Sequence, residues 1–572
     1  MNVVPATHRA SKLAIHFGAN ASQRVRTMLQ RQNLGNHPLG QREVAAGAIG
    51  YVGQVEMPEH GNLLFFTGLP IHGPDIRQVV DTDTAAQQLP DHDGAFAGVF
   101  WDEQRGILTV VTDCLGMQPL YMRHAKGELT LVSTTSAMHG DPDPAAWGAF
   151  ISLGHPIGER SLMDGLQRVP PASVLTWDSA QRRLDVHRYW HWPEPSEAWR
   201  HHDFLDTLGR DVGAYAAFGN HGTLLLSGGF DSRLLLFLLK RARISTQALI
   251  VAHADEYGDA DGRLAEAVAT GANVRHRKVH PPTDFFSSSA YLDYLRASDV
   301  GYPSLDLFIA KVASQIDDPA VWDGLAPGFV FMPLHQHEGG FDAYRQHEVR
   351  GRDSAIWRAA KTLFKAEVVD AMFEGFSDDF RSETSRLPQD MHGLARFVIE
   401  NRSRNRASMN PLKVYASRTD AYTPGLSKDF MNHAATIPFA EKRDGRFYRN
   451  LFARLDRHAL SVPFLSGGDL MRGSSASAYW REQVQAQFHA QRVRHPKLFP
   501  GAPRSRTARS GFLGAHLLEP DPWLNPGLHD KLKAIASDNY LAWKLLFHWK
   551  AWQWLHQGQF ERLAETDTEH AS

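Results

Sequence analysis

A glycine-rich turn between a strand-like run and a helix-like run is the feature that most restricts how this chain can fold. Residues 223–236 read Thr-Leu-Leu-Leu-Ser-Gly-Gly-Phe-Asp-Ser-Arg-Leu-Leu-Leu. The apolar run that ends at Leu226 predicts a buried strand, and the run from Ser232 onward predicts a helix. Gly228 and Gly229 let the backbone turn tightly and approach a ligand without an intervening Cβ atom. The segment therefore predicts a strand–turn–helix unit with an accessible turn.

The same turn carries groups that suit a phosphate chain. A helix N-terminus offers unpaired N–H groups and the positive end of its dipole. The hydroxyls of Ser227 and Ser232 add further donors. The Asp231 carboxylate would repel a bare phosphate, so its presence favours a Mg²⁺ ion that bridges it to the phosphates. We predict a pyrophosphate cradle with Asp231 as a metal ligand and catalytic residue; the residues expected to bind are Leu226, Ser227, Gly228, Gly229, Asp231 and Ser232.

Two other interpretations of the turn have less support. A Gly-Gly turn with a serine cap is commonly structural, but the full Ser-Gly-Gly-x-Asp-Ser string between a strand and a helix favours a binding loop. The turn is not a Walker loop, because no Gly-Lys-Ser/Thr follows it.

Short apolar runs and helical patterns alternate through the middle of the chain. The apolar runs lie at 223–226, 248–252 and 321–323, and the helical patterns lie at 233–241 and 261–270. This alternation predicts a parallel sheet with crossover helices. Residues 354–460 and 530–564 read as mostly helical. One helical face near the C-terminus is typical of a core stripe; it holds Trp543, Leu546, Phe547, Ala551, Trp554 and Leu555.

The first third of the chain has a different pattern. Short strand-like runs at 63–67, 96–101, 108–112 and 129–133 are separated by Gly, Asp and Pro, which predicts a sheet-based domain. The proline-bearing stretch 190–199 is interpreted as a linker. A length of 572 residues suits two to four domains.

Composition excludes several classes of function. The formal net charge is −2, from 61 basic and 63 acidic side chains, so neither bulk nucleic-acid binding nor membrane-surface binding is indicated. No run approaches the ~20 apolar residues of a membrane span, so we expect no stable membrane insertion. The one cysteine, Cys114, excludes an intramolecular disulfide and a cysteine zinc cluster. With no apolar signal-peptide core in residues 1–17, the chain is expected in the cytoplasm.

Two family resemblances follow from these motifs. The turn resembles the PP-loop of the ATP pyrophosphatase superfamily, whose members cleave ATP between the α and β phosphates and form an adenylate. Residues 93–102, Asp-Gly-Ala-Phe-Ala-Gly-Val-Phe-Trp-Asp, and residues 108–121, which end in Asp-Cys-Leu-Gly-Met-Gln-Pro-Leu-Tyr, closely resemble the glutaminase-like domain of the asparagine synthetase B family. Residues 131–137 and 166–172 fit the next strand and the closing turn of that domain.

The combined resemblance spans roughly residues 60–560 and implies a two-domain fold. Residues 1–195 would form an α+β sandwich of the Ntn-hydrolase type, a class II glutamine amidotransferase-like domain. Residues 201–565 would form an α/β PP-loop synthetase domain, HUP-like, with a parallel sheet and helical additions. The resemblance also implies ATP and Mg²⁺ as cofactors.

One departure from the family changes the expected chemistry. Glutamine-hydrolysing members have a cysteine directly after the initiator Met, where this chain has Asn2 and Val3. Cys114 lies in mid-domain, just after a strand-like run, and does not replace it. The first domain therefore resembles a degenerate glutaminase kept as a scaffold, and glutamine-derived ammonia is not the expected nucleophile.

Relatives that lack this cysteine include β-lactam and carbapenam synthetases and lasso peptide cyclases. We favour the lasso cyclase, which adenylates an Asp or Glu side chain of a precursor peptide before the N-terminal amine of the peptide closes a macrolactam. The Tyr–Glu pair of β-lactam synthetases has no match here. The lasso interpretation implies three partners: the precursor peptide, a leader-binding protein and a leader peptidase.

The resemblance implies further site residues. Val251 and Ala252 end the second strand of the PP-loop domain, where backbone groups bind adenine in the family; the alternative is a plain core strand. The family's S-G-x-G-A-D-E loop corresponds to residues 321–328, and Pro327 occupies the position of the family's aspartate. Either the second Mg²⁺ carboxylate has moved to Asp323, beside Gly324 in the nucleotide loop, or it is lost.

Two basic segments complete the predicted site. The stretch 401–406 resembles the family's R-x-N-K helix, so Arg404 and Arg406 are expected to brace phosphates, although such helices are commonly solvated faces. The stretch 504–512 resembles the R-x-K-x-G-F loop and places Arg509 where a lysine stabilises the leaving pyrophosphate. Arginine supplies charge there but does not act as a base. Residues 335–338, His-Gln-His-Glu, do not have zinc-helix spacing.

Three alternative functions stay open. An asparagine synthetase, using ammonia or glutamine, would make asparagine from aspartate. A small-ring cyclase of the β-lactam synthetase kind would use the same adenylation. A non-catalytic scaffold would carry a degraded site, for which Pro327 and the altered residues 420–422 are the best support.

Overall fold

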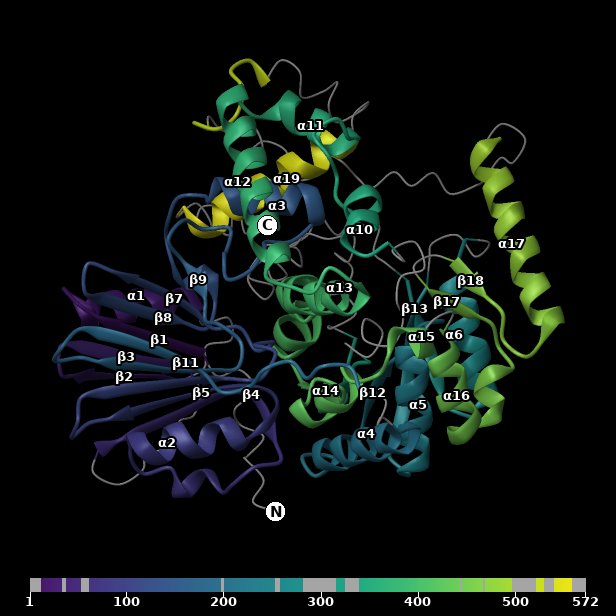
Figure 1. Ribbon diagram of the computed structural model, residues 1–572, viewed down its shortest axis with the longest axis horizontal. Coiled ribbons are helices and arrows are strands. Elements are labelled where there is room, and N and C mark those ends of the chain that lie inside the picture. Colours follow the sequence, from purple (N-terminus) through teal and green to yellow (C-terminus); the bar gives the residue numbers. More distant parts are fainter. Residues whose placement is uncertain are drawn as a thin grey trace, which may run out of the picture.

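The computed structural model describes eleven segments: residues 12–32, 38–52, 61–196, 200–252, 258–280, 315–324, 339–442, 445–466, 469–495, 521–528 and 540–557. Two antiparallel sheets lie before residue 196, and a parallel sheet with many helices follows (Figure 1).

The first half is a sandwich of two facing sheets. Among the described residues one sheet has six strands, in the order β2 (Leu39–Val44), β3 (Gly47–Val52), β1 (Lys12–Phe17), β8 (Glu128–Val132), β7 (Tyr121–Ala125) and β9 (Gln167–Arg168). The other has five, in the order β11 (Arg183–Arg188), β10 (Ser173–Asp178), β6 (Ile107–Thr112), β5 (Asp93–Asp102) and β4 (Leu63–Ile71). Ile15 and Leu131 of the first sheet share a core with Val99, Trp101 and others of the second, so the sheets pack face to face.

Helices cover the outer faces of this sandwich. Helix α1 (Ala21–Gln32) packs on β1 and β3, and α2 (Thr82–Gln88) packs on β5 and β6. Val25 and Leu29 of α1 are buried, as is Ala85 of α2. This helix–sheet–sheet–helix order is the α+β sandwich expected from the sequence. Three predicted strand runs lie within β4, β5 and β6, and the fourth, 129–133, extends one residue past β8.

The second half contains a parallel sheet of five strands within the described ranges. The order is β14 (His276–Val279), β13 (Ser245–Val251), β12 (His221–Leu225), β15 (Ala320–Trp322) and β16 (Asp420–Tyr422), and every pairing is parallel. The predicted alternation of strands and helices is confirmed by α5 (Asp231–Arg241) and α6 (Ala260–Gly271), which follow β12 and β13. The edge strand β16 was not predicted.

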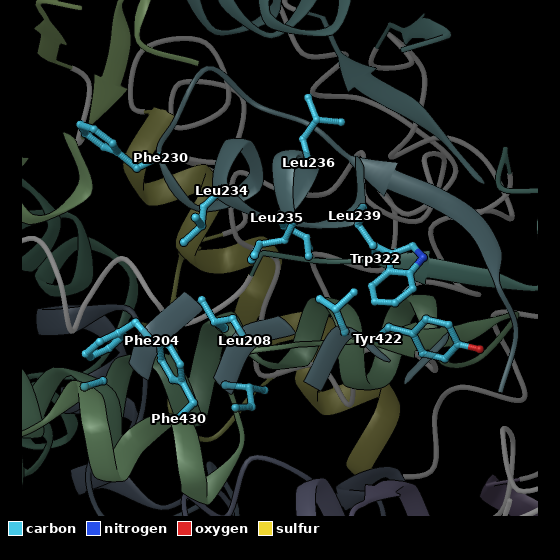
Figure 2. Close-up of a cluster of buried hydrophobic side chains, with 14 of the residues drawn as sticks. Phe204, Leu208, Phe230, Leu234, Leu235, Leu236, Leu239, Trp322, Tyr422 and Phe430 are labelled. Atoms are coloured by element: carbon cyan, nitrogen blue, oxygen red, sulfur yellow. The ribbon is translucent and has the colours of Figure 1, made fainter. Parts of the chain in front are cut away.

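The parallel sheet is buried on both of its faces. Ala248 and Ile250 of β13 belong to one hydrophobic core, whereas Leu249, which points the other way, belongs to another. Figure 2 shows the first of these cores, in which Leu234 and Leu235 of α5 pack with Phe204 of α4 (His201–Ala216) and Phe430 of α14 (Lys428–Ala434). The two buried faces fix the position of the β12–α5 turn.

Helical additions surround the sheet. They are α10 (Phe341–His347), α11 (Ala355–Leu363), α12 (Ala366–Ser385), α13 (Met391–Val398), α15 (Phe439–Lys442), α16 (Arg446–Leu455), α17 (Ala476–Arg494) and α19 (Tyr540–His556). Two π-helical segments, η8 (Ile399–Ala407) and η9 (Asn410–Tyr415), follow α13. A short hairpin, β17 (Phe464–Ser466) with β18 (Asp469–Met471), precedes α17. No helix of the described residues is both long and apolar enough to span a bilayer.

Helix α19 is more deeply buried than the predicted stripe implied. Beyond the six expected core residues, Leu545, Trp549 and Trp552 are also buried, so apolar side chains occupy every side of the helix. Trp549 and Trp552 pack on Trp147 of α3 (Pro144–Leu153), with ring centroids 4.9 Å and 5.9 Å away. The helix therefore joins the end of the chain to the first half.

The stretch predicted as a linker, 190–199, is in its described part an anchored segment. Trp190 and Trp192 are buried. The Trp190 indole donates to Asn432 Oδ1 at 2.8 Å, and the Trp192 indole donates to Glu400 Oε1 at 2.7 Å. The described part of the stretch connects β11 to α4 without helix or strand, as predicted for a linker, but its two indoles are fixed on the second half.

A contact between an exposed histidine and a buried aspartate also joins the two halves. His72 Nε2 lies 3.4 Å from Asp211 Oδ1, and Asp211 accepts a 2.6 Å hydrogen bond from the Ser427 hydroxyl. The hydrogen bond to Asp211 raises the pKa of His72 above its usual 6.5. A group whose folded-state pKa is raised stabilises the fold below its unfolded pKa, and this contribution disappears as pH rises through the folded pKa.

We therefore expect the melting temperature of the wild type to fall relative to that of His72→Gln as pH rises from 6.5 through the raised pKa of His72. Differential scanning fluorimetry of both proteins across this range measures the difference. His187→Gln on the exposed face of β11 is the control and should show no such change relative to wild type. Parallel pH curves for wild type and His72→Gln would contradict the prediction.

Candidate functional site

The turn between β12 and α5 lies at the carboxyl edge of the parallel sheet. Strand β12 has β13 on one side and β15 on the other, so the ends of three strands meet there. Leu226 is buried and its N–H donates to Leu249 O at 3.0 Å, which extends the strand pairing to the start of the turn. Ligands of open α/β sheets bind at this edge, outside the carboxyl ends of the strands.

Two serine hydroxyls tie the turn to the helix. Ser232 Oγ accepts from the Ser227 N–H at 3.1 Å, and the two hydroxyls lie 2.9 Å apart. The Gly229 N–H donates to Ser227 Oγ at 3.3 Å. The serines predicted as ligand donors thus hold the turn in shape in this structure. Whether they also contact a phosphate stays a prediction.

An acidic side chain already lies on one N–H group of the turn. Asp261 Oδ1 accepts from the Gly228 N–H at 2.9 Å, and burial raises the pKa of Asp261. Asp261 belongs to the first turn of α6, which follows the neighbouring strand. An oxygen of a carboxyl group therefore occupies a donor of the kind that phosphates use. Sequence reasoning did not assign Asp261 to the site, although the residue opens the second predicted helix.

Asp231 is held by a tyrosine from a distant helix. The Tyr448 hydroxyl of α16 donates to Asp231 Oδ1. Burial raises the pKa of Tyr448 well above its usual value, so the hydroxyl keeps its proton and remains a donor. The Tyr448 ring stacks on Phe230, with centroids 4.8 Å apart, and Phe230 stacks on Phe464 at 4.2 Å. This stack fixes the orientation of the Asp231 carboxylate.

The end of β15 lies against the first turn of α5. A Cβ atom placed on Gly324 would lie 2.8 Å from Ser232 N and 2.9 Å from the Asp231 carbonyl carbon, so only glycine fits. The Asp323 N–H donates to Tyr422 O at 2.9 Å. The structure therefore brings Asp323 and Asp231, the two predicted metal ligands, onto adjoining backbone segments.

The carboxylates fit a hard cation in chemical type, because Mg²⁺ takes oxygen ligands and is commonly bound through one or two carboxylates plus substrate phosphates. Within the described ranges no group of three or more His, Cys, Asp or Glu side chains is arranged to hold a metal.

A buried arginine connects the turn to the segment that precedes β17. Arg233 donates to Gly228 O at 3.1 Å, and also to three carbonyls just before β17: Ala459 at 3.0 Å, Val462 at 2.8 Å and Pro463 at 2.7 Å. Burial lowers the pKa of its guanidinium to about 9. Sequence reasoning missed this role, although a single charge directly before the apolar run 234–239 signals a buried partner.

The residues predicted to bind adenine lie beside the turn. Val251 is the last residue of β13, and Ala252 follows it and is buried. The Ala252 N–H donates to Val279 O at 2.9 Å. The position suits a nucleotide base next to the phosphate turn, and the adenine role of these residues stays a prediction.

The structure does not bring Arg404 to the turn. Its guanidinium donates to Val169 O at 2.8 Å, to Gly116 O at 3.3 Å and to Glu159 Oε2 at 2.7 Å, all of the first half. Segment η8 packs there because Arg168 of β9 reaches back and donates to Arg404 O at 2.5 Å. Arg404 is therefore part of the seam between the halves.

Arg406 is also directed elsewhere. A guanidinium nitrogen of Arg406 lies 3.0 Å from the Cβ position of Gly154, which ends α3. Burial lowers the pKa of His155 to about 3, and the positive charge of Arg406 contributes to this lowering. Several other predicted positions, namely Arg509, Pro327 and residues 335–338, lie outside the described residues.

Cys114 is not placed as a nucleophile. It lies two residues after β6, is buried, and burial raises its pKa well above the usual value of a thiol. A reactive cysteine requires thiolate character and access to substrate. This geometry agrees with the prediction that Cys114 does not replace the family's catalytic cysteine.

Comparisons with known proteins bear on the first half. The family model described as a glutamine amidotransferase domain matches residues 81–190. No curated protein sequence matches the chain. Among solved structures, the glutamine phosphoribosylpyrophosphate amidotransferase from B. subtilis complexed with ADP and GMP is 10% identical, with a TM-score of 0.22. The alignment covers 47% of this chain and only 65% of that one.

A second solved structure, that of an allosteric regulatory enzyme of purine biosynthesis, is 12% identical with a TM-score of 0.23, over 54% of this chain and 92% of that one. TM-scores this low indicate nothing about the function of this chain. The family match and the facing sheets agree with each other: the N-terminal half contains an α+β domain of the glutamine amidotransferase type.

Proposed function

We propose that the chain is an ATP-dependent synthetase that forms an amide bond through an acyl-adenylate. One observation carries the proposal: the Ser-Gly-Gly-Phe-Asp-Ser turn lies at the carboxyl edge of a parallel sheet, with Asp231 oriented by Tyr448 and with Asp323 on the adjoining segment. Two carboxylates at a helix N-terminus suit a metal-bound pyrophosphate and repel a bare anion.

In the first step, some groups of the site bind phosphate and others bind the metal. Backbone N–H groups at the start of α5 bind the β and γ phosphates, and Asp231 and Asp323 hold Mg²⁺. A bound Mg²⁺ supplies positive charge that neutralises the phosphate oxygens. A substrate carboxylate oxygen attacks the α-phosphorus, the α–β P–O bond breaks, and pyrophosphate leaves. Arg509 is proposed to stabilise the negative charge of the departing pyrophosphate.

The second step forms the amide. An amine nitrogen attacks the carbonyl carbon of the adenylate, the bond to the AMP oxygen breaks, and the ammonium proton passes to solvent or to AMP. Water must be kept out, because it would hydrolyse the adenylate.

For the substrate, we propose a peptide that supplies both the carboxylate and the amine, as in lasso peptide cyclases. The Asp or Glu side chain of a precursor peptide would be adenylated, and its N-terminal amine would close the ring. A leader-binding protein and a leader peptidase would be partners. Support comes from the resemblance of the motifs, together with a glutamine amidotransferase-like domain in which Cys114 is buried.

One observation favours a second candidate. The match to a glutamine amidotransferase domain favours an enzyme of the asparagine synthetase kind, which would take ammonia as the nucleophile. Formation of asparagine from aspartate, ammonia and ATP by the purified chain would support this candidate. The buried Cys114 argues against glutamine as the ammonia source in that case.

ATP–pyrophosphate exchange tests the proposal. The purified chain is incubated with ATP, Mg²⁺, labelled pyrophosphate and a set of peptides that have a free N-terminus and an Asp or Glu several residues later. Exchange that requires Mg²⁺ and peptide, with AMP as the product, is expected. Release of ADP, or no nucleotide turnover with peptides or aspartate, would contradict adenylation.

Substitution of Gly324 by alanine is expected to weaken Mg-ATP binding about tenfold, roughly 1.4 kcal/mol. The added Cβ would lie 2.8 Å from Ser232 N and push the end of β15 away from α5. Isothermal titration calorimetry measures the dissociation constant. Gly271→Ala at the end of α6 is the matched control, because nothing lies within 4 Å of its Cβ position. Equal affinities in the two variants would argue against a nucleotide between these segments.

A further inference from the structure

Helix α17 displays an apolar ridge to solvent. In the described part of the chain, six large hydrophobic side chains are well exposed. Three of them lie on this helix: Trp480 is 57% exposed, Val484 61% and Phe488 40%. The other three, Leu39, Val80 and Val186, are scattered over the first half. Single exposed apolar residues are ordinary, whereas a contiguous set marks an interaction site.

The ridge lies on the side of α17 that faces away from the protein. Glu482 is buried in an ion pair with Arg263 of α6 at 2.8 Å, and the His489 ring lies 2.8 Å from the Cβ position of Gly258. At 100° per residue, Val484 points about 150° away from the direction shared by Glu482 and His489. Figure 1 shows α17 at the right margin of the molecule, beyond α6 and the β17–β18 hairpin.

Positive charge surrounds the ridge. Arg481 and Arg494 are exposed, and the Arg472 guanidinium lies 5.6 Å from the centroid of the Trp480 ring. The one acidic residue within α17 is Glu482, whose charge is already paired with Arg263. A partner therefore meets apolar side chains flanked by arginines, and negative charge on the partner would be favoured.

The spacing of the ridge indicates the shape of the partner. On a helix, side chains four residues apart form a ridge, and such a ridge packs into a groove on the surface of a second helix. We propose that α17 is the docking site of an acidic amphipathic helix on a separate polypeptide. Apolar side chains of the partner would pack around Trp480 and Phe488, and its carboxylates would pair with Arg481 and Arg494.

Two other occupants fit less well. A second copy of α17 would bring the arginines of one ridge against those of the other, and like charges facing each other oppose association. A membrane surface would have to be held by these three side chains and a few arginines, which is little apolar area for a helix anchored in the interface.

The position of α17 connects this surface with the candidate site. The hairpin that precedes α17 contacts the turn directly, since the Leu465 N–H of β17 donates to Gly228 O at 3.1 Å. A polypeptide docked on α17 would thus be held close to the segment that contacts the turn. The docking surface does not depend on the proposed chemistry, because peptide binding is measured without ATP.

The test uses fluorescence anisotropy with the full chain and a labelled 18-residue helical peptide. The probe has leucines along one face and glutamates on the flanks. A second peptide has the same composition with the leucines spread around the helix, and a third has lysine in place of glutamate. The wild type is expected to bind the first peptide at least about tenfold more tightly than either of the others.

Two sets of substitutions separate the apolar and charged contributions. The triple variant Trp480→Ser, Val484→Asn, Phe488→Ser is expected to bind the acidic peptide at least about tenfold more weakly. Arg481→Glu with Arg494→Glu should weaken binding of the acidic peptide and strengthen binding of the lysine peptide. Val186→Asn, an exposed apolar residue on β11, is the control and should bind as the wild type does.

Several results would overturn the proposal. These are no binding to the wild type at millimolar peptide, equal binding of the two glutamate peptides, or unchanged binding by the triple variant. A doubled mass in sedimentation that the triple variant abolishes would assign the ridge to a second copy. Binding to phosphatidylserine vesicles that the triple variant abolishes, without preference among the peptides, would assign it to a membrane.

Discussion

Replacement of Asp231 by asparagine is expected to lower Mg²⁺-dependent ATP–pyrophosphate exchange about 10²–10³-fold. Asparagine has nearly the same shape and keeps the oxygen that accepts from the Tyr448 hydroxyl, so the turn should keep its conformation. What is lost is the negative charge that holds the metal. Initial exchange rates at saturating Mg-ATP, together with circular dichroism of the folded variant, measure the effect.

The control for this substitution is Asp206→Asn on the exposed side of the neighbouring helix α4, which should keep the wild-type rate. The exchange rate of Tyr448→Phe should lie between those of Asp231→Asn and Asp206→Asn, because this variant loses the hydroxyl that orients Asp231 but keeps the carboxylate charge. Wild-type exchange in Asp231→Asn would mean that the turn does not bind the metal–nucleotide complex. Loss of exchange in Asp206→Asn as well would show that the assay responds to general damage.

The turn could be predicted from sequence because its signals are local. A buried run ending at Leu226, two glycines and a helix beginning within six residues leave few alternatives. The parallel sheet followed from the same alternation of strands and helices. The strand β16 was missed because three residues, Asp420–Tyr422, show no periodicity, and their pairing with β15 is set by a partner about 100 positions earlier in the chain.

The parts of the site that could not be predicted depend on long-range contacts. Tyr448 lies 217 positions from Asp231, and nothing in its local sequence indicates that its hydroxyl meets a carboxylate. The arginines of residues 401–406 illustrate the same difficulty. A guanidinium that braces phosphates and one that pairs with backbone carbonyls have the same sequence pattern, and Arg404 does the second.

The seam between the halves shows what the amidotransferase-like domain contributes physically. Arg168 and Arg404 are both buried, and both donate to Gly116 O. Asp93 of β5 accepts from the backbone N–H groups of Lys428 and Asp429 at the start of α14. Buried polar contacts of this kind are costly to break, so the two halves are expected to unfold together. A domain without an accessible cysteine would thus still support the parallel sheet.

Substitution of Arg233 by methionine is expected to destabilise the second half of the protein by about 3–5 kcal/mol. Methionine fills similar space but donates no hydrogen bonds. The carbonyl oxygens of Ala459, Val462 and Pro463 would lose the donor that Arg233 supplies, whereas Gly228 O would keep the Leu465 N–H. Each buried acceptor left unsatisfied costs about 1–3 kcal/mol, and relaxation together with the apolar burial of methionine recovers part of the sum.

Hydrogen exchange of the α5 peptides, followed by mass spectrometry, measures this loss locally, and thermal unfolding measures it globally. Arg210→Met is the matched control, since Arg210 is 60% exposed and pairs with Asp429 at 3.4 Å; its change should stay below about 1 kcal/mol. Equal protection of α5 in the two variants would mean that the carbonyls find other donors. If Arg233→Met alone loses protection, the shape of the turn depends on a cation buried beneath it, and nucleotide affinity should fall in parallel with the protection of α5.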